Sequence, residues 1–188
     1  MRITGGKAAG VRLQTPRKGP EVRPATDRMR EAVFSNIGSG VIGSKVLDLF
    51  AGTGAYGLEA LSRGASAVTW VESSRRVAGI LESNRQAVRK SMGSPQSAEH
   101  VIVRDFRRHG IPSNRQFDFI FADPPYNLAE DLLTDLMAFA DNYLFPSGTF
   151  LLECRGDLPL PIQEWTEVRR FGNEKSGPSL RVLKRCND

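Results

Sequence analysis

Residues 47–57 read LDLFAGTGAYG, and this stretch decides the fold. Gly52, Gly54 and Gly57 follow a short apolar segment in the spacing G-x-G-x-x-G, which is typical of a turn from a β-strand into a helix beside a nucleotide. Asp48 stands four residues before the first of these glycines, inside the predicted strand. The glycine spacing alone also fits a tight structural turn, so the identity of the ligand depends on what that acid can bind.

Strands and helices alternate on both sides of this glycine loop. Apolar segments rich in β-branched and aromatic residues predict strands over 45–50, 67–72, 100–104, 117–122 and 149–154. Helical spacing of apolar residues predicts helices over 26–38, 55–63, 73–93 and 132–140, and residues 146–148 predict a turn. The first of these helices is predicted to bury Met29, Ala32, Val33 and Ile37. Residues 165–171 and 179–185 predict a closing antiparallel pair of strands. We therefore predict an α/β fold with a doubly wound, mostly parallel sheet, helices on both faces and an antiparallel pair at its C-terminal end.

The acid inside the first strand distinguishes between two kinds of nucleotide cofactor. A dinucleotide would place a pyrophosphate beside the glycine loop, and a buried carboxylate at Asp48 would repel it. S-adenosylmethionine instead offers an ammonium and a sulfonium group, which a carboxylate attracts. Glu72 ends the next strand, 18 residues after Gly54, where an acid accepts hydrogen bonds from the ribose of either cofactor. Asp105 follows the third strand, where it could accept from an adenine amine or equally cap a helix. The predicted cofactor-binding residues are Asp48, Ala51, Gly52, Gly54, Glu72 and Asp105.

The fourth predicted strand is followed by the sequence DPPYN, residues 123–127. Two prolines fix the backbone and hold Asp123 and Tyr126 in a rigid turn at the carboxyl end of the sheet. The exocyclic amine of a nucleobase is a weak nucleophile, and acceptors for its N–H groups turn the nitrogen lone pair toward a methyl donor. The carboxylate of Asp123 and the carbonyl of Pro124 can supply those acceptors, and Tyr126 can stack on the base. A proline turn that only ends a strand is the alternative, but its place after the glycine loop and Glu72 favours methyl transfer to an amine.

Positive charge is concentrated at the N-terminus. Residues 1–30 contain eight Lys and Arg against two acids, a net charge of +6, so the +5 of the whole chain leaves −1 for the other residues. Such a basic arm suits a polyanion because neutralising phosphates releases counterions, although a solvated tail fits the composition as well. We predict a single domain, 1–188, into which the basic arm 1–30 leads.

The sequence composition also predicts the cellular compartment of the protein. No apolar segment approaches the ~20 residues of a membrane span, and the N-terminus lacks the apolar core of a secretion signal. The two cysteines and two histidines form no metal-binding spacing. We therefore expect a cytoplasmic protein with reduced thiols, no metal and no membrane partner.

These motifs together resemble a known family. LDLFAGTGAYGLEAL, VES and DPPY are similar, in order, to the motifs of class I S-adenosylmethionine-dependent methyltransferases that act on exocyclic amines. RITGGKAAGVRL and VRPATDRMREAVFSNI are similar to the opening of the bacterial small-subunit ribosomal RNA guanine-N2 methyltransferases, the RsmD family. The resemblance covers residues 2–126, and EKSGPSLRVLKR departs from it. It implies methylation at N2 of a guanine in a hairpin loop of 16S ribosomal RNA, within an assembling or assembled small subunit. Because one site on the surface of a large particle needs no second copy, we expect a monomer. The catalytic residues are then Asp123, Pro124 and Tyr126, and the substrate-binding residues are Pro125, Arg23, Arg28 and Arg30.

Three other functions remain open. An adenine-N6 DNA or RNA methyltransferase would use the same Asp-Pro-Pro-Tyr turn, and the N-terminal segment argues for ribosomal RNA instead. An NAD-dependent oxidoreductase would use the glycine loop, and Asp48 argues against it. A non-catalytic RNA-binding assembly factor would keep the fold, and the intact Asp123 and Tyr126 argue against that.

Overall fold

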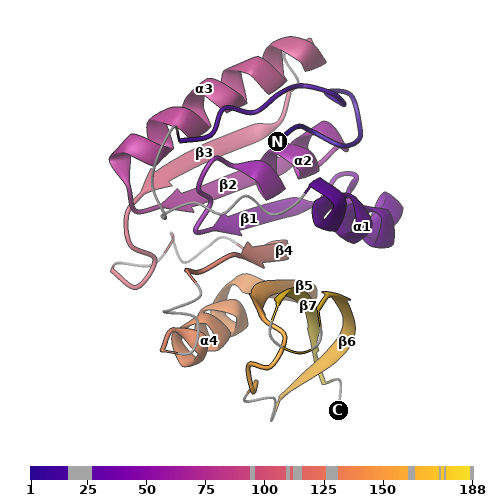
Figure 1. Ribbon diagram of the computed structural model, residues 1–188, viewed down its shortest axis with the longest axis vertical. Coiled ribbons are helices and arrows are strands. Elements are labelled where there is room, and N and C mark those ends of the chain that lie inside the picture. Colours follow the sequence, from indigo (N-terminus) through magenta and orange to yellow (C-terminus); the bar gives the residue numbers. More distant parts are fainter. Residues whose placement is uncertain are drawn as a thin grey trace.

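The computed structural model describes residues 1–16, 27–93, 96–108, 111, 116–125, 131–160, 164–173, 175 and 177–186. Its strands are β1 (Lys45–Leu49), β2 (Ala67–Glu72), β3 (Ala98–Val103), β4 (Phe117–Ala122), β5 (Leu144–Arg155), β6 (Trp165–Gly172) and β7 (Pro178–Arg185). Its helices are α1 (Asp27–Ile37), the 3₁₀ turn η1 (Gly38–Val41), α2 (Ala55–Ser62), α3 (Arg75–Met92) and α4 (Leu133–Tyr143). Figure 1 shows their arrangement.

The strands form one seven-stranded sheet in the order β3-β2-β1-β4-β5-β7-β6. Neighbouring strands from β3 to β5 run parallel, whereas β7 is antiparallel to both β5 and β6. The predicted fold class, including the antiparallel C-terminal pair, is therefore confirmed. The chain leaves β1 toward β2 and β3 and then returns to β4 on the other side of β1, so the strand order reverses between β1 and β4. Such a switch point is where ligands of open α/β sheets bind.

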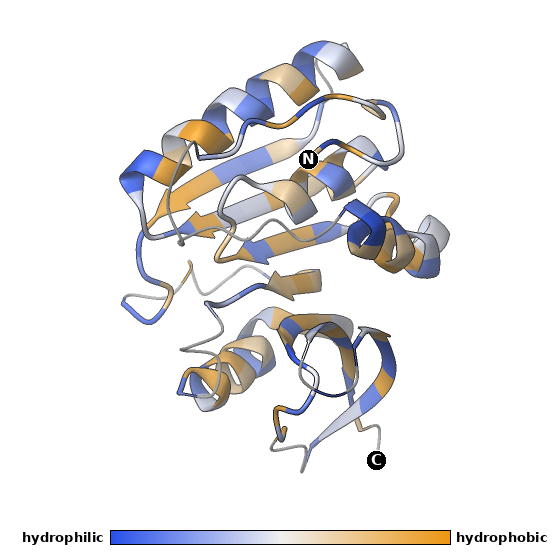
Figure 2. Ribbon diagram, viewed as in Figure 1, coloured by the Kyte–Doolittle hydropathy of each residue, from blue (hydrophilic) through white to orange (hydrophobic). Residues whose placement is uncertain are grey.

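Two apolar layers cover the two faces of the sheet. One layer joins the inward side chains of β1, β2 and β4 to α1, α2 and α3, and it contains Val46, Trp70 and Phe121. The other layer joins the alternate side chains to α4, and it contains Leu47 and Ile120. The central strands are accordingly coloured as mainly hydrophobic in Figure 2, while hydrophilic and hydrophobic turns alternate along α3. This burial on both faces explains why the strands read as apolar runs.

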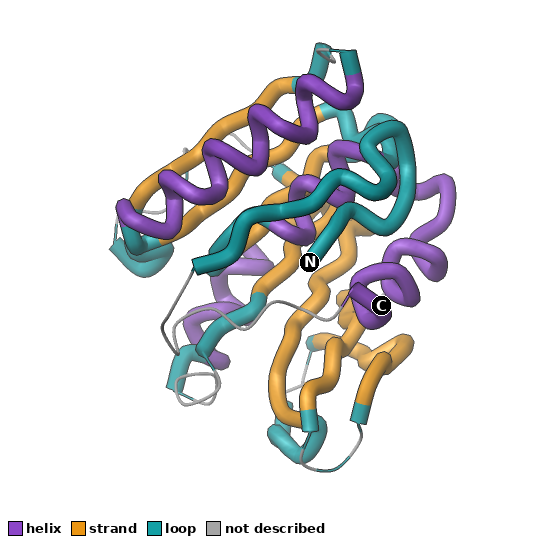
Figure 3. Tube along the Cα trace, turned by 45° about the horizontal axis from the view of Figure 1, so that its top comes forward, coloured by secondary structure: helices purple, strands orange, loops and turns teal. Residues whose placement is uncertain are grey.

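Residues 1–16 pack against the domain. Ile3, Ala8 and Leu13 are buried in the layer that contains α2 and α3. The backbone N–H of Ala8 donates to Ser62 Oγ at 2.9 Å. The segment runs across α2 and alongside α3 in both views (Figure 1, Figure 3). The first half of the basic arm is therefore folded onto the domain, and residues 17–26 lie outside the described residues.

Two local predictions are corrected. Residues 146–148, predicted as a turn, lie inside β5, where pairing with β4 shifts from Phe117↔Leu144 to Phe119↔Thr149. The proline and glycine are accommodated as an irregularity within the strand, because the two strands resume pairing beyond it. In α1 the buried residues are Arg30, Val33 and Phe34, whereas Ala32 is exposed.

Candidate active site

Four acidic side chains lie near the carboxyl ends of four neighbouring strands. They are Glu72 in β2, Asp48 in β1, Asp123 just after β4 and Glu153 in β5. The side chain two residues before each acid belongs to the apolar layer that contains α1, α2 and α3. Because successive side chains of a strand point to opposite faces of the sheet, all four acids lie on the face that this layer covers. Those preceding side chains are Trp70, Val46, Phe121 and Leu151. The acids therefore form a row that crosses the switch point between β1 and β4.

The glycine loop brings α2 close to its neighbours. Gly54 caps the N-terminus of α2 with φ 85°, and a Cβ atom there would overlap the side chain of Leu81 on α3. A Cβ atom on Gly57 would overlap the indole of Trp70 on β2. The second and third glycines of the motif are thus required by a left-handed backbone and by close packing of the helix on the sheet.

Two of the four acids, Glu72 and Asp48, accept backbone hydrogen bonds from the glycine loop and its flanks. Glu72 accepts the backbone N–H of Gly52 at 2.9 Å and that of Ser74 at 2.7 Å. Asp48 accepts the backbone N–H of Gly57, in the first turn of α2, at 2.9 Å. Because a carboxylate has about four acceptor positions, these bonds leave capacity for a ligand. Ala51 is buried, and its N–H donates to the carbonyl of Val71 at 3.0 Å.

Burial and mutual repulsion raise the pKa of the central acids. Burial raises the pKa of Asp48 to about 8, with the charge of Glu72 adding to the shift and the Gly57 hydrogen bond opposing it. The pKa of Asp123 is raised well above its ordinary value by burial, then by the charges of Glu153 and Asp48. A site that disfavours carboxylate charge in this way is stabilised by a cationic ligand.

The turn after β4 emerges at the switch point. The N–H of Asp123 faces the carbonyl of Leu49 on β1 at 3.4 Å, so the turn starts beside the glycine loop. Pro124 is buried and Pro125 is exposed. Tyr126, predicted to stack on a base, lies outside the described residues.

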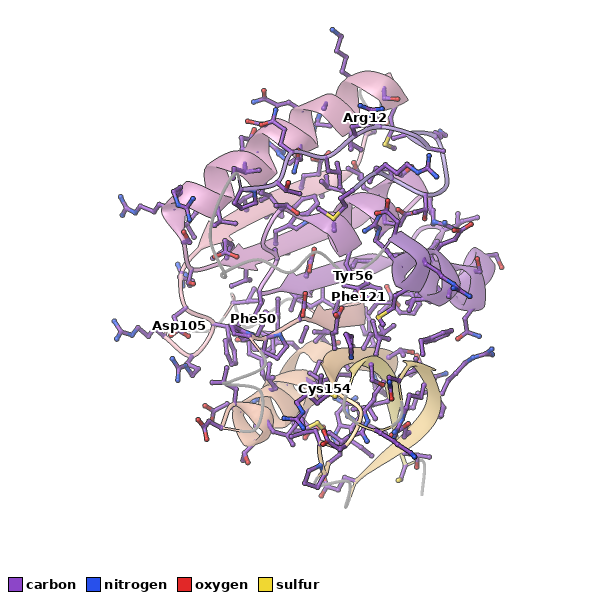
Figure 4. All side chains as sticks on the ribbon, viewed as in Figure 1. Arg12, Phe50, Tyr56, Asp105, Phe121 and Cys154 are labelled. Atoms are coloured by element: carbon purple, nitrogen blue, oxygen red, sulfur yellow. The ribbon has the colours of Figure 1, made fainter. Side chains whose placement is uncertain are left out.

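Phe50 connects β1 to the glycine loop in a strained conformation. Its φ is 55°, and it is the one residue other than glycine with positive φ in the described part of the chain. Its ring, which is labelled in Figure 4, packs edge-on against Phe106, with centroids 5.2 Å apart. Positive φ is rare for a bulky side chain and concentrates at functional sites, which agrees with a binding loop here.

The predicted substrate arginines have different environments. Arg28 is exposed on α1, and Arg23 lies outside the described residues. Arg30 is fully buried, and its guanidinium donates to Glu59 at 3.2 Å, to Asp27 at 2.9 Å and to the carbonyl of Arg2. The structure thus gives Arg30 a structural role in place of the predicted contact with substrate.

Asp105 follows β3 and makes local contacts with Arg107. Its carboxylate accepts the backbone N–H of Arg107 at 3.0 Å and pairs with the Arg107 guanidinium at 2.8 Å. These bonds hold the pKa of Asp105 below its ordinary value, with the Arg107 side chain as the main cause. Residues 106–108 form a turn and no helix in the described part of this connection, so these bonds do not cap a helix, and contact of Asp105 with an adenine stays a prediction.

Two side chains that the sequence analysis did not single out join this region. Glu153, the fourth acid of the row, is 5% exposed and accepts the hydroxyl of Tyr56 at 2.9 Å. Asn84 on α3 donates to the carbonyls of Thr53 at 3.0 Å and Gln14 at 3.1 Å and accepts the N–H of Gln14 at 2.7 Å. An acid inside the apolar run TFLLEC was the available signal for Glu153. Asn84 links the N-terminal segment to the glycine loop.

Comparisons with known proteins agree with this geometry. The family model described as "Conserved hypothetical protein 95" matches residues 1–177. "Ribosomal RNA small subunit methyltransferase D" of Haemophilus influenzae is 36% identical over 173 residues, covering 90% of this chain and 86% of that protein. The solved structure of "Putative methyltransferase yhhF from Escherichia coli" superposes with a TM-score of 0.79 at 28% identity, covering 98% of this chain and 97% of that one.

The sheet order, the glycine loop and the acids at the strand ends define the class I methyltransferase fold. Within this class the chain belongs to the RsmD family, the family of the small-subunit methyltransferase D proteins. A more distant structure, "SMU.776, a putative methyltransferase complexed with SAH", has a TM-score of 0.63 at 17% identity, covering 87% of this chain and 50% of that one. That likeness shows the fold alone.

Among the described residues, no group of His, Cys, Asp and Glu is arranged to hold a metal ion. The same part of the chain contains no helix with the length and apolar character of a membrane span.

Proposed function

We propose that this protein transfers a methyl group from S-adenosylmethionine to N2 of a guanine in the 16S RNA of the small ribosomal subunit. The observation that carries the proposal is the Asp123–Pro124 turn, which starts beside Asp48 and the glycine loop at the switch point. Ribosomal RNA as the substrate is supported by the name of the Haemophilus influenzae relative. Guanine N2 is supported by the resemblance of the N-terminal segment.

The residues at the strand ends fit this cofactor. When bound, it supplies an electrophilic methyl group on a cationic sulfur. Asp48 would hold the cofactor ammonium, because its buried carboxyl lies at the carboxyl end of β1 beside the glycine loop, and a cation there would offset the burial that raises its pKa. Glu72 would accept from the ribose hydroxyls while it keeps the Gly52 N–H in place. A doubly negative pyrophosphate would meet repulsion from both acids.

Asp123 and Pro124 act on the target amine. Their oxygens accept the two N–H groups, so that the nitrogen lone pair points toward the methyl carbon. As the N–C bond forms, the C–S bond breaks and the nitrogen becomes cationic. The proton then leaves nitrogen, and the raised pKa of Asp123 suits its carboxylate to receive that proton. Tyr126 and Pro125 would pack against the base, which is turned out of an unpaired loop.

Exposed cations on the N-terminal segment and α1 would contact phosphates. They are Arg2, Lys7, Arg12 and Arg28. Arg12 lies on the segment that runs beside α3 (Figure 4). Contacts of this kind position RNA without reading its sequence.

The deciding experiment is transfer of tritiated methyl groups, followed by nucleoside analysis. Small subunits, free 16S RNA and duplex DNA are offered separately. N2-methylguanosine in a ribosomal substrate alone is the expected result. N6-methyladenosine, or transfer to DNA, would retain the mechanism and replace the substrate. Cofactor binding without transfer to any of the three would favour an assembly factor.

Cofactor affinity should depend on pH through Asp48. With a pKa of about 8 the free carboxyl is mostly protonated at pH 6, and it must ionise to pair with an ammonium. Raising the pH from 6 to 7.5 is therefore expected to lower the Kd for S-adenosylmethionine by up to about tenfold per unit. Measurements stay below pH 7.5 because an α-amino group itself titrates at about 7.7–8.0. Isothermal calorimetry in buffers of different ionisation enthalpy would also detect the proton released.

Asp48→Asn supplies the matched control. The amide keeps the size of the side chain and cannot ionise, so its weaker binding should be independent of pH over this range. An equally steep pH dependence in the variant would assign the titration to another group.

Asn84→Ala should weaken cofactor binding from a distance. The change removes the bond to the Thr53 carbonyl in the glycine loop and both bonds to Gln14. We expect the Kd for S-adenosylmethionine to rise about five- to tenfold, the equivalent of one lost buried hydrogen bond. Gln86→Ala, at an exposed position of the same helix, is the control and should leave the Kd unchanged. An unchanged Kd in Asn84→Ala would mean that the loop keeps its shape without this link.

A further inference from the structure

Glu153 stands beside Asp123 on the next strand of the sheet. The register pairs Ala122 with Leu152, so the following residues, Asp123 and Glu153, are neighbours at the carboxyl ends of β4 and β5. Both come two residues after members of the same core layer, so both side chains lie on the same side of the sheet. Strands in a sheet are about 4.8 Å apart, which places two acceptor groups next to each other at the amine-binding turn.

Tyr56 positions the Glu153 carboxylate through a hydrogen bond. Its hydroxyl donates to Glu153 Oε2 at 2.9 Å. Its ring lies on Phe121 with centroids 4.9 Å apart and an interplanar angle of 16°, and Phe121 in turn stacks on Phe34. Figure 4 shows Tyr56 and Phe121 together at the centre of the molecule. Burial raises the pKa of Tyr56, and the nearby charge of Glu153 adds to the shift, so the phenol stays protonated as the donor.

The Watson–Crick edges of the purines differ in what they present next to the reactive amine. Guanine places the N1–H donor beside its N2 amine, whereas adenine places the N1 lone pair beside its N6 amine. A carboxylate can only accept hydrogen bonds. In their ionised forms, two neighbouring carboxylates therefore match guanine, and one of them would face a lone pair if adenine occupied the same position.

We propose that Glu153 is a specificity-determining residue, which accepts the N1–H of the target guanine while Asp123 accepts an N–H of its N2 amine. This inference rests on the proposed function and names the group that selects guanine. A carboxylate offers about four acceptor positions, and the bond from Tyr56 takes one of those of Glu153. Tyr56 is a positioning residue, because it would act only through Glu153.

The test compares guanosine with 2-aminopurine riboside at the methylated position of the RNA. The analogue keeps the 2-amino group but carries a lone pair at N1. The position is first mapped with the wild-type protein, and the modified 16S RNA is reconstituted into small subunits where free RNA is not a substrate. We expect the wild-type protein to prefer guanine in kcat/KM by at least about 100-fold, as sites built to bind a donor reject analogues that lack it.

Glu153→Gln should reduce that preference to within about tenfold, because the amide can donate to the N1 lone pair of the analogue. Tyr56→Phe, which keeps the stacked ring and removes the hydroxyl, should give an intermediate ratio. In both variants the Kd for S-adenosylmethionine should stay within about twofold of the wild-type value, which shows that the fold is retained.

The outcomes separate the inference from the proposed function. If the wild-type protein makes N2-methylguanosine and neither variant changes the base preference, the role of Glu153 is wrong and the proposed function stands. An equal loss of activity on both bases would assign Glu153 a structural role. If the wild-type protein makes no N2-methylguanosine, both the proposed function and this inference fall.

Discussion

Replacing Asp123 with alanine is expected to lower kcat for methyl transfer by a factor of about 10²–10³, the loss seen when one positioned polar group is removed from an active site. The residue lies at the switch point of the sheet, and under the proposed function alanine removes an acceptor for the amine N–H together with the group that would take its proton. The cofactor ammonium would contact Asp48 on the neighbouring strand instead. The Kd for S-adenosylmethionine should therefore change little, and single-turnover measurements should place the defect in the methyl-transfer step.

Asp118→Ala is the matched control for this variant. Asp118 lies near the opposite end of β4, where it accepts the backbone N–H of Lys45 at 2.8 Å. Its loss removes an acid from the same strand far from the switch point, so kcat should stay within about twofold of wild type. Comparable loss in both variants would show that the effect of Asp123→Ala comes from the strand and not from the carboxylate. Full activity of Asp123→Ala would remove the catalytic role of this residue.

The sequence was sufficient to predict most of the secondary structure because local and global preferences agree there. Strands β1, β2 and β4 are buried on both faces and read as apolar runs. Helix α3 begins after Ser74, whose hydroxyl accepts the N–H of Val77, and it ends at Gly93 with φ 72°. Both ends carry residue types that cap helices by themselves. The rules for connecting parallel strands then limit the possible orders of the sheet.

The failures have a different origin, because each depends on a partner that is distant in sequence. Arg30 looks like an exposed basic residue until Glu59, 29 positions later, is brought against it in the folded chain. Ala32 has the right spacing for a core face, but α1 is rotated so that Arg30 and Val33 face inward. Glu153 reads as one acid within a strand, and only the pairing of β4 with β5 reveals it as a neighbour of Asp123.

The largest expected effect on stability comes from Glu59→Ala. Glu59 is fully buried in α2 and receives Arg30 Nε at 3.2 Å, Arg63 Nε at 2.8 Å and both the N–H and the hydroxyl of Thr4 at 2.8 Å. The network joins α1, α2 and the N-terminal segment. Alanine would leave the buried Arg30 guanidinium without this carboxylate, and breaking a buried pair from one side costs about 3–5 kcal/mol. Urea denaturation should show this loss as a lower midpoint with the same slope.

Asp157→Ala provides the comparison, since Asp157 forms an ion pair of the same kind with Arg155 at 2.8 Å while about half of each side chain is exposed to solvent. Water screens such a pair, and its loss should cost less than about 1 kcal/mol. Both pairs join a carboxylate to a guanidinium. The difference in unfolding free energy between the two variants therefore measures the effect of burial. Limited proteolysis adds a local readout: in Glu59→Ala, cleavage within residues 1–16 should become faster, because Thr4 loses both of its bonds to Glu59. If Glu59→Ala is no more destabilising than Asp157→Ala, the N-terminal segment is held by its other contacts, namely the buried side chains of Ile3, Ala8 and Leu13 and hydrogen bonds such as that from Ala8 to Ser62.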